Sequence, residues 1–219
     1  MLLSKEVISK NTVGYGLLSR ENIYNNTIFG PIYSIGGIDS YTKLMLHMNG
    51  TNGSTTFTDS SLSPKTVTAN GNAQISTAQY KFGGASGLFD GTGDYLSVPD
   101  SDDWYFGTGD FTIDFWMKAN TIGRHDILSQ QNGSNLWLLS VNTSTGLVSI
   151  DTDPAGYVEF GTNGITAITN NTNWFHTAVI RNGNTMIIFI NGANVYSNTI
   201  TASWLDVAAP LLVGRFQTI

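Results

Sequence analysis

Hydrophobic and polar residues alternate along much of the chain beyond residue 41. The clearest case runs from Phe111 to Lys118, where Phe, Ile, Phe and Met occupy one face and Thr, Asp, Trp and Lys the other. Successive side chains of a β-strand point to opposite faces, so this period of two predicts a half-buried strand. Similar short runs between turn residues predict strands at Lys43–Met48, Asp94–Val98, Asp126–Gln130, Leu136–Val141, Leu147–Asp151, Tyr157–Phe160, Thr177–Arg181, Thr185–Ile190 and Asn194–Ser197.

Two Asn-Gly dipeptides predict tight hairpins in the last part of the chain. They are Asn182-Gly183 and Asn191-Gly192. Asn-Gly favours type I′ turns, which need positive φ at both central positions. About ten short strands without a long amphipathic helix predict an all-β fold, a two-sheet antiparallel sandwich of the jelly-roll type. The large apolar residues expected to fill the core between the sheets are Phe111, Phe115, Trp174, Ile187 and Phe189.

Composition agrees with this fold class and narrows the range of functions. Only 12% of the 219 residues are charged, and 24 residues are Gly. Exposed helix faces are normally built from Lys, Glu and Arg. The net charge of −6 argues against a nucleic-acid partner, which needs a basic surface. No apolar run approaches the roughly 20 residues of a membrane span, so no membrane partner is expected. The first residues do not resemble a secretory signal, which favours a cytoplasmic protein or one released by host-cell lysis.

Residues 1–40 differ in character from the rest of the chain. Apolar pairs recur there without a sustained period of two or 3.6. Flexible leaders are usually poor in Ile, Leu, Tyr and Phe, so this content favours an arm that orders on a partner. The sequence therefore predicts an anchoring arm at residues 1–40 and a jelly-roll domain at residues 41–219. The arm residues expected to be buried against neighbouring subunits are Leu17, Leu18, Ile28, Phe29, Ile32 and Tyr33.

Three segments, residues 81–100, 111–118 and 174–192, resemble laminin-G-like, concanavalin A-like jelly-roll domains and occur in the family's order. The first reads KFGGASGLFDGTGDYLSVPD and the second FTIDFWMK. Residues 47–59, HMNGTNGSTTFTD, resemble variants common in virion structural and fibre proteins of tailed bacteriophages. The resemblance implies a virion protein, either a head decoration or a tail or fibre component. Its partners would be other virion proteins and further copies of itself.

The sequence departs from the family at its end. Family members usually finish with a further strand that closes the sheet beside an early strand, and residues 213–219 end the chain without it. Natural proteins cover such open strand edges, because an open edge pairs with other chains. Truncation, replacement by the N-terminal arm and completion by a neighbouring chain would each explain the departure. We predict that the edge is covered.

The acidic and histidine residues give little support for catalysis. A retaining glycosidase needs two carboxyl groups about 5–5.5 Å apart. Asp151 and Asp153 alternate, but Pro154 follows at once, which favours a turn. The three histidines share no metal-ligand spacing, and His47 and His176 are expected to be structural residues of strands. A non-enzymatic protein is therefore expected, with a glycan hydrolase as the least favoured alternative.

Two binding functions remain open. Asp100, Asp102 and Asp103 gather the hard oxygen donors that Ca²⁺ prefers, and the resemblance implies calcium at the rim of the sandwich, although acidic turns are often solvated caps. The alternative to a virion structural role is a glycan-binding adhesion module for host or environmental carbohydrate. Sugar sites need an exposed aromatic platform with nearby amides, whereas a Trp in a strand is more often a core residue. The residues that fit are Trp137, Tyr157, Tyr105, Asn132 and Asn135.

Overall fold

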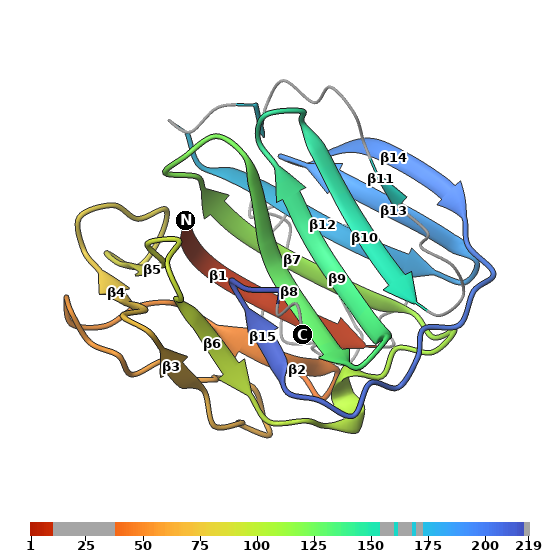
Figure 1. Cartoon of the computed structure of the whole chain (residues 1–219), viewed down its shortest axis with the longest axis horizontal. Coiled ribbons are helices and arrows are strands. Elements are labelled where there is room, and N and C mark those ends of the chain that lie inside the picture. The colour runs from red at the N-terminus through yellow and green to blue at the C-terminus, as the bar shows by residue number, and fades with distance from the viewer. Residues whose placement is uncertain (11–37, 154–159, 162–167, 170–172, 217–219) are drawn as a thin grey trace, which may run out of the picture.

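The computed structural model describes residues 1–10, 38–153, 160–161, 168–169 and 173–216 as two stacked antiparallel sheets (Figure 1). Sheet A has the order β14 (Ala193–Thr199), β13 (Thr185–Ile190), β12 (Phe175–Asn182), β7 (Phe111–Lys118), β1 (Leu2–Lys10), β5 (Ser86–Leu88) and β4 (Gln74–Ser76), with β2 (Thr42–Leu46) paired to β1. Sheet B has the order β11 (Phe160–Gly161), β10 (Leu147–Asp153), β9 (Asn135–Asn142), β8 (Arg124–Asn132), β15 (Leu211–Val213), β6 (Tyr95–Val98) and β3 (Thr68–Asn70). One 3₁₀ turn, η2 (Asp102–Trp104), precedes β7. The predicted all-β antiparallel jelly-roll sandwich is confirmed.

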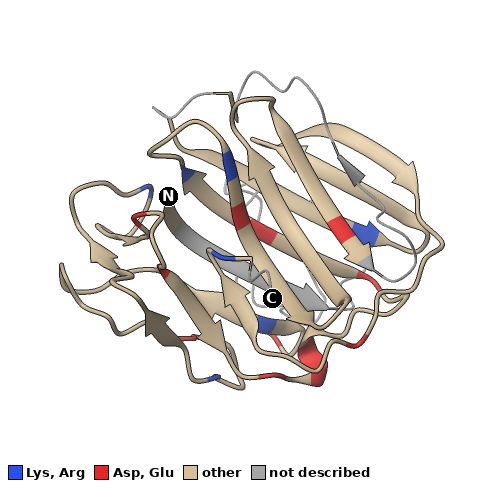
Figure 2. Ribbon diagram, viewed as in Figure 1, with Lys and Arg blue, Asp and Glu red and all other residues tan. Residues whose placement is uncertain are grey.

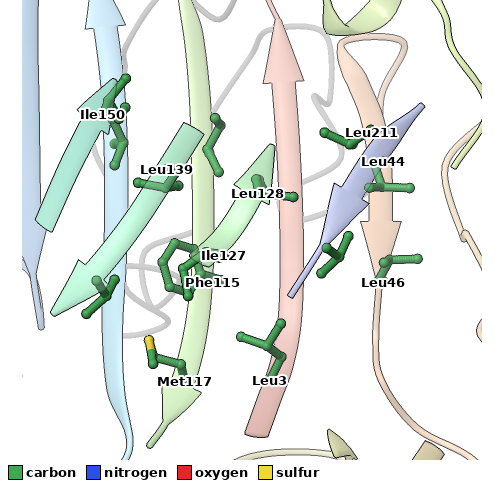
Figure 3. Close-up of a cluster of buried hydrophobic side chains, with 14 of the residues drawn as sticks. Leu3, Leu44, Leu46, Phe115, Met117, Ile127, Leu128, Leu139, Ile150 and Leu211 are labelled. Carbon is green, nitrogen blue, oxygen red and sulfur yellow. The ribbon is translucent and has the colours of Figure 1, made fainter. Parts of the chain in front are cut away.

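The core lies between the sheets, where side chains from both sides meet (Figure 3). The inward residues of β7 have no exposed surface, as the alternation predicts. Burying each large apolar side chain contributes about 1.5–3 kcal/mol, so this interface is the main source of stability. Residues that fill it include Leu3, Leu44, Leu46, Phe115, Met117, Ile127, Leu128, Leu139, Ile150 and Leu211.

The prediction for β13 is wrong about which face is buried. Met186 and Ile188 face the core, while Ile187 and Phe189 lie on the outer side and are only partly covered. The segment TMIIFI is apolar at both sets of alternating positions, so the sequence does not distinguish its two faces. Of the other expected core residues, Phe111 and Phe115 are buried and Trp174 is partly buried.

The two Asn-Gly hairpins form different turns. Asn191 and Gly192 have φ values of 50° and 82°, and they connect β13 to β14 as the predicted type I′ pair. In the other hairpin Asn182 pairs with Thr185, so the connecting residues are Gly183 and Asn184 rather than Asn-Gly. Only the glycine of this pair has positive φ, 57°, which fits a type II′ turn and corrects the type I′ prediction.

Some strands carry too little sequence signal to be predicted. The three-residue strands β3, β4, β5 and β15 are shorter than the windows in which alternation is recognisable. The predicted strand Tyr157–Phe160 lies mostly outside the described residues, which resume with β11 at Phe160.

The N-terminal residues form a strand that the sequence did not predict. β1 lies inside sheet A, paired with β7 along one edge and with β2 and β5 along the other. Leu2 and Leu3 are buried. β1 therefore fills the space between β7 on one side and β2 with β5 on the other, while the covering of the edge beside the family's last strand stays a prediction. Residues 1–10 belong to the sandwich rather than to the expected arm at 1–40, and the arm residues Leu17, Leu18, Ile28, Phe29, Ile32 and Tyr33 lie outside the described residues.

Candidate functional site

The tryptophan expected to offer a sugar platform is a core residue. Trp137 is 1% exposed on the inward face of β9. Its indole Nε1 donates to Gln130 Oε1 at 2.8 Å, and the Gln130 amide donates to the Ala209 carbonyl at 2.6 Å. This chain of bonds satisfies the polar atoms that Trp137 and Gln130 bring into the interior. Trp137 therefore stabilises the sandwich and offers no surface to a ligand.

The other sugar-site candidates are not assembled around an aromatic ring. Asn132 and Asn135 are exposed at the β8–β9 hairpin, where Asn132 Nδ2 donates to the Ala208 carbonyl at 3.1 Å. Tyr105 is 40% exposed and lies just after η2. Tyr157 lies outside the described residues.

The expected calcium ligands include an aspartate that is paired with two lysines. Asp103 forms ion pairs with Lys65 at 2.7 Å and with Lys43 at 3.6 Å. Burial alone would raise the pKa of Asp103, but the hydrogen bond and charge of Lys65, with the charge of Lys43, hold that pKa below its ordinary value. Asp100 Oδ1 accepts from the Ser101 N–H at 3.0 Å. In the described part of the chain no three His, Cys, Asp or Glu residues are placed to hold a metal ion, and this includes Asp100, Asp102 and Asp103.

The carboxylates on the outer face of sheet B are held by arginine. β10 continues through Asp153, so Asp151 and Asp153 lie in a strand where a turn was expected. Asp151 is 1% exposed, and its Oδ2 lies 3.9 Å from Arg124 Nη2. Arg124 Nε donates to Asp126 Oδ1 at 2.9 Å. Both carboxylates therefore lie beside the same guanidinium group.

A polar cleft of about 370 Å³ lies at one rim of the sandwich, and its acidic side chains are bonded mainly to the loops that line it. Asp94 accepts the backbone N–H groups of Asn72 at 2.7 Å and of Asp90 at 2.8 Å. Arg124 and Asp126, which also line the cleft, pair with each other. The bonds of Asp94 fix the turns that contain Asn72 and Asp90. The acidic residues of this cleft therefore stabilise its loops and strands.

An aromatic group lies on the outer face of sheet A, with Phe82 exposed and Trp116 and His176 partly buried, and we call these three residues the aromatic platform. Trp116 projects outward from β7 because its inward neighbours alternate with it, and His176 lies directly opposite on β12. Their ring centroids are 5.4 Å apart. Phe82, from the loop between β4 and β5, meets Trp116 edge to face at 5.5 Å. Phe82 is 50% exposed and the neighbouring Tyr80 is 53% exposed.

Polar contacts fix the position of the platform. His176 Nε2 lies 3.3 Å from Asp114 Oδ2, and the His176 backbone N–H donates to Asn191 Oδ1 at 2.9 Å. Gly83 follows Phe82 with φ of 67°, a conformation that favours glycine and lets the loop turn back beside β2. The platform therefore rests on two adjacent strands and one glycine-hinged loop.

Two lysines and a small pocket border the platform. Lys81 Nζ lies 4.3 Å from the Trp116 ring centroid, and Lys118 Nζ donates to Gln79 Oε1. An open pocket of about 210 Å³ beside Phe82 is lined by His47, Asn49, Phe82 and Gly83. His47 is exposed beyond the end of β2, so its prediction as a strand residue is wrong, whereas His176 lies in a strand as expected.

The sequence contains a signal for this platform in the alternation of β7. Trp116 occupies the face that also carries Thr112, Asp114 and Lys118. A large aromatic residue among polar residues of one strand face indicates exposure. The contribution of Phe82 has no comparable signal, because the pairing of distant strands places its loop beside Trp116.

The fold and the family model agree on the class of protein, a lectin-like jelly-roll sandwich. A laminin-G family model, described as the concanavalin A-like lectin/glucanases superfamily, matches residues 90–218. The chain therefore belongs to this superfamily. A comparison with curated proteins gives no match. Among the described residues, no helix is long and apolar enough to cross a membrane.

Solved structures with the same fold share little sequence with this chain. The receptor-binding domain of a botulinum neurotoxin C/D mosaic serotype matches with a TM-score of 0.58 and 17% identity, over 73% of this chain and 40% of the toxin domain. Domain 4 of AbnA, an extracellular arabinanase from Geobacillus stearothermophilus in complex with arabinotriose, matches with a TM-score of 0.54 and 16% identity, over 71% and 76% of the two chains. A botulinum neurotoxin DC binding domain in complex with rat synaptotagmin II matches with a TM-score of 0.57 and 15% identity, over 74% of this chain and 42% of the toxin chain. These similarities establish the fold.

Proposed function

We propose that the protein is a non-enzymatic glycan-binding module that recognises saccharide through the aromatic platform. The observation that carries this proposal is the half-exposed ring of Phe82 against Trp116 and beside an open pocket that His47 and Asn49 also line. Large aromatic side chains that stay exposed in a contiguous patch usually mark an interaction surface. This patch joins rings from a loop and two strands, so it is a built surface rather than a single exposed side chain.

The chemistry of the platform matches that of a sugar. The apolar face of a sugar ring packs on an aromatic ring, while its hydroxyl groups need amide, imidazole or charged partners close by. Asn49 and His47 line the pocket beside Phe82, and Lys81 lies over Trp116. Both kinds of contact are therefore available within one patch.

The acidic residues support binding without hydrolysis. Asp151 is buried and, like Asp126, lies beside Arg124. Asp114, the carboxylate next to the platform, is bonded to His176. A glycosidase of the usual kind needs a second carboxyl group facing the first across the sugar. The complex of an AbnA domain of the same fold with arabinotriose supports saccharide recognition by this architecture.

A glycan array, followed by calorimetry on the hits, tests the proposal. We expect Phe82→Ala to weaken binding at least about tenfold, because a central aromatic contact is a typical binding hot spot. The matched control is Tyr105→Ala. Tyr105 is also an exposed aromatic residue, but it precedes the start of β7, whereas Trp116 lies near the end of that strand. Equal affinity of wild type and Phe82→Ala would contradict the placement of the site, and an array without hits would contradict glycan binding.

We also propose that the module is carried on a bacteriophage virion, as a head decoration or a tail or fibre component. The support is the resemblance of residues 47–59 to phage virion proteins. Ser9 pairs with Thr42, so β1 and β2 can be joined through residues 38–41 after residues 11–37 are deleted. This deletion should leave a folded, sugar-binding domain that no longer enters particles, as measured by mass spectrometry of purified virions. Normal incorporation would contradict anchoring by residues 11–37.

A further inference from the structure

We infer that the saccharide bound by the platform is anionic and carries carboxylate or sulfate groups. This inference rests on the proposed function and concerns the same site. It starts from the distribution of cations, since the chain has 10 Lys and Arg against 16 Asp and Glu. Charged residues are sparse along the described strands of both sheets (Figure 2), so a local group of lysines needs an explanation.

Among the cations whose side chains the structure describes, most of those away from the platform have a partner within the protein. Lys43 and Lys65 pair with Asp103, and Arg124 pairs with Asp126. Pairing with an aspartate neutralises a cation and removes the need for an external anion. These residues therefore contribute to the structure rather than to ligand recognition.

The lysines of the platform have no such partner among the side chains that the structure describes. Among the described residues no carboxylate lies within ion-pair distance of Lys81 or Lys118. Lys118 donates to the neutral Gln79 side chain, and Lys81 contacts the rings of Trp116 and Phe82 at 4.3 and 6.0 Å. Asp114 is the acid at the platform, and it is bonded to His176. Two positive charges thus remain available for an external anion.

The position of Lys81 also bears on neutral sugars. Its ammonium group lies over Trp116, where the apolar face of a neutral sugar would otherwise stack. A neutral ligand must displace this charge from the ring and gains nothing in exchange. An anionic sugar can pair with the ammonium where it lies and stack on the exposed ring of Phe82. The arrangement therefore favours a charged over a neutral sugar.

Two matched pairs of polymers test this inference. Unesterified homogalacturonan is compared with its methyl-esterified form, and dextran sulfate with dextran, because each pair shares a backbone and differs in charge. At low ionic strength we expect the charged member to bind at least about fivefold more tightly, with the ratio falling as salt screens the charges. Lys81→Gln with Lys118→Gln should remove the preference, whereas Lys43→Gln, which alters a paired lysine, should keep it.

The outcomes separate the inference from the proposed function. Equal binding of charged and neutral members would overturn the anionic preference and leave saccharide binding intact. A preference that survives in the Lys81→Gln, Lys118→Gln variant would overturn its assignment to the platform. Equally tight binding to double-stranded DNA would show a general affinity for polyanions and would also overturn the inference. Absence of binding to all four polymers, while the glycan array gives neutral hits, would count against it as well.

Discussion

Two aromatic clusters, each with a cation, lie on opposite sides of sheet A. The inner cluster fills one end of the core and consists of Phe106, Phe111, Trp137 and Trp204, with Arg181 at its edge. The outer cluster is the aromatic platform with Lys81. The residue types are similar, yet the inner rings are at most 2% exposed, whereas Phe82 is 50% exposed.

The cations show the difference most clearly. Arg181 is 1% exposed, and its Nη1 donates to the carbonyls of Gly107 and Ala202, each at 3.0 Å. Desolvation lowers the pKa of Arg181, and the charge of Asp110 opposes this shift. A buried charge must be satisfied by the protein itself, whereas the exposed Lys81 is solvated and can exchange water for a ligand. The comparison teaches that burial, not composition, separates a stabilising cluster from a binding surface.

Removing a ring from the inner cluster should have the largest effect. We expect Trp137→Ala to lower the free energy of unfolding by about 3–5 kcal/mol, because it leaves a cavity and removes the donor to Gln130 Oε1. Urea unfolding measures the loss. A change below about 1 kcal/mol would contradict the placement of Trp137 in the core and would reopen its interpretation as a sugar platform.

Removing the inner cation should be the next largest effect. Arg181→Met keeps most of the buried side-chain volume but leaves the Gly107 and Ala202 carbonyls without this donor. We expect a loss of about 2–3 kcal/mol in urea unfolding, since each buried polar group left unsatisfied is costly. The matched variant Lys81→Met on the outer cluster should change the free energy of unfolding by no more than about 0.5 kcal/mol. Equal losses in the two variants would break the comparison.

The same ring removal on the outer cluster should affect binding more than stability. We expect Trp116→Ala to weaken glycan binding at least about tenfold while lowering the free energy of unfolding by about 1 kcal/mol or less. Calorimetry and urea unfolding of one preparation measure both quantities. A variant that binds normally but unfolds easily would show that Trp116 is a structural residue.

Lys65 is intermediate between the buried Arg181 and the exposed Lys81. It is partly buried, its Nζ lies 5.0 Å from the Trp104 ring centroid, and it is paired with Asp103. The pKa of Asp103 is lowered in the folded state, so its pairing stabilises the protein above the ordinary value of 3.8 and is lost as the pH falls through the folded pKa. Asp103→Asn should cost about 0.5–1 kcal/mol at neutral pH. The difference from wild type should shrink below pH 3.8. A difference that stays constant with pH would contradict the ion pair.

Calcium should have the smallest effect of all. Asp103 is engaged by lysines, and the described residues do not form a metal-ligand cluster. We therefore expect millimolar Ca²⁺ or EGTA to leave the melting temperature unchanged. A calcium-dependent rise that Asp102→Asn abolishes would restore the acidic loop as a cation site.

The strength of the local pattern explains where sequence reasoning succeeded. Phe111–Lys118 alternates cleanly, so both its strand and its buried face followed from the sequence. Thr185–Ile190 is apolar on both faces, so the strand was predictable and the buried face was not. Trp137 and Trp116 both lie in strands. The only sequence feature that distinguishes them is that the neighbours of Trp116 on its own strand face are polar.

The sequence by itself determined the all-β class, the family and most long strands, because alternation and turn residues act over a few neighbouring positions. The tertiary structure decided the use of residues 2–10 as a strand of sheet A and the meeting of Phe82, Trp116 and His176 on its outer face. Both depend on pairing between strands far apart in the chain. Local patterns do not encode such pairing, since its free energy comes from the whole sheet and its core.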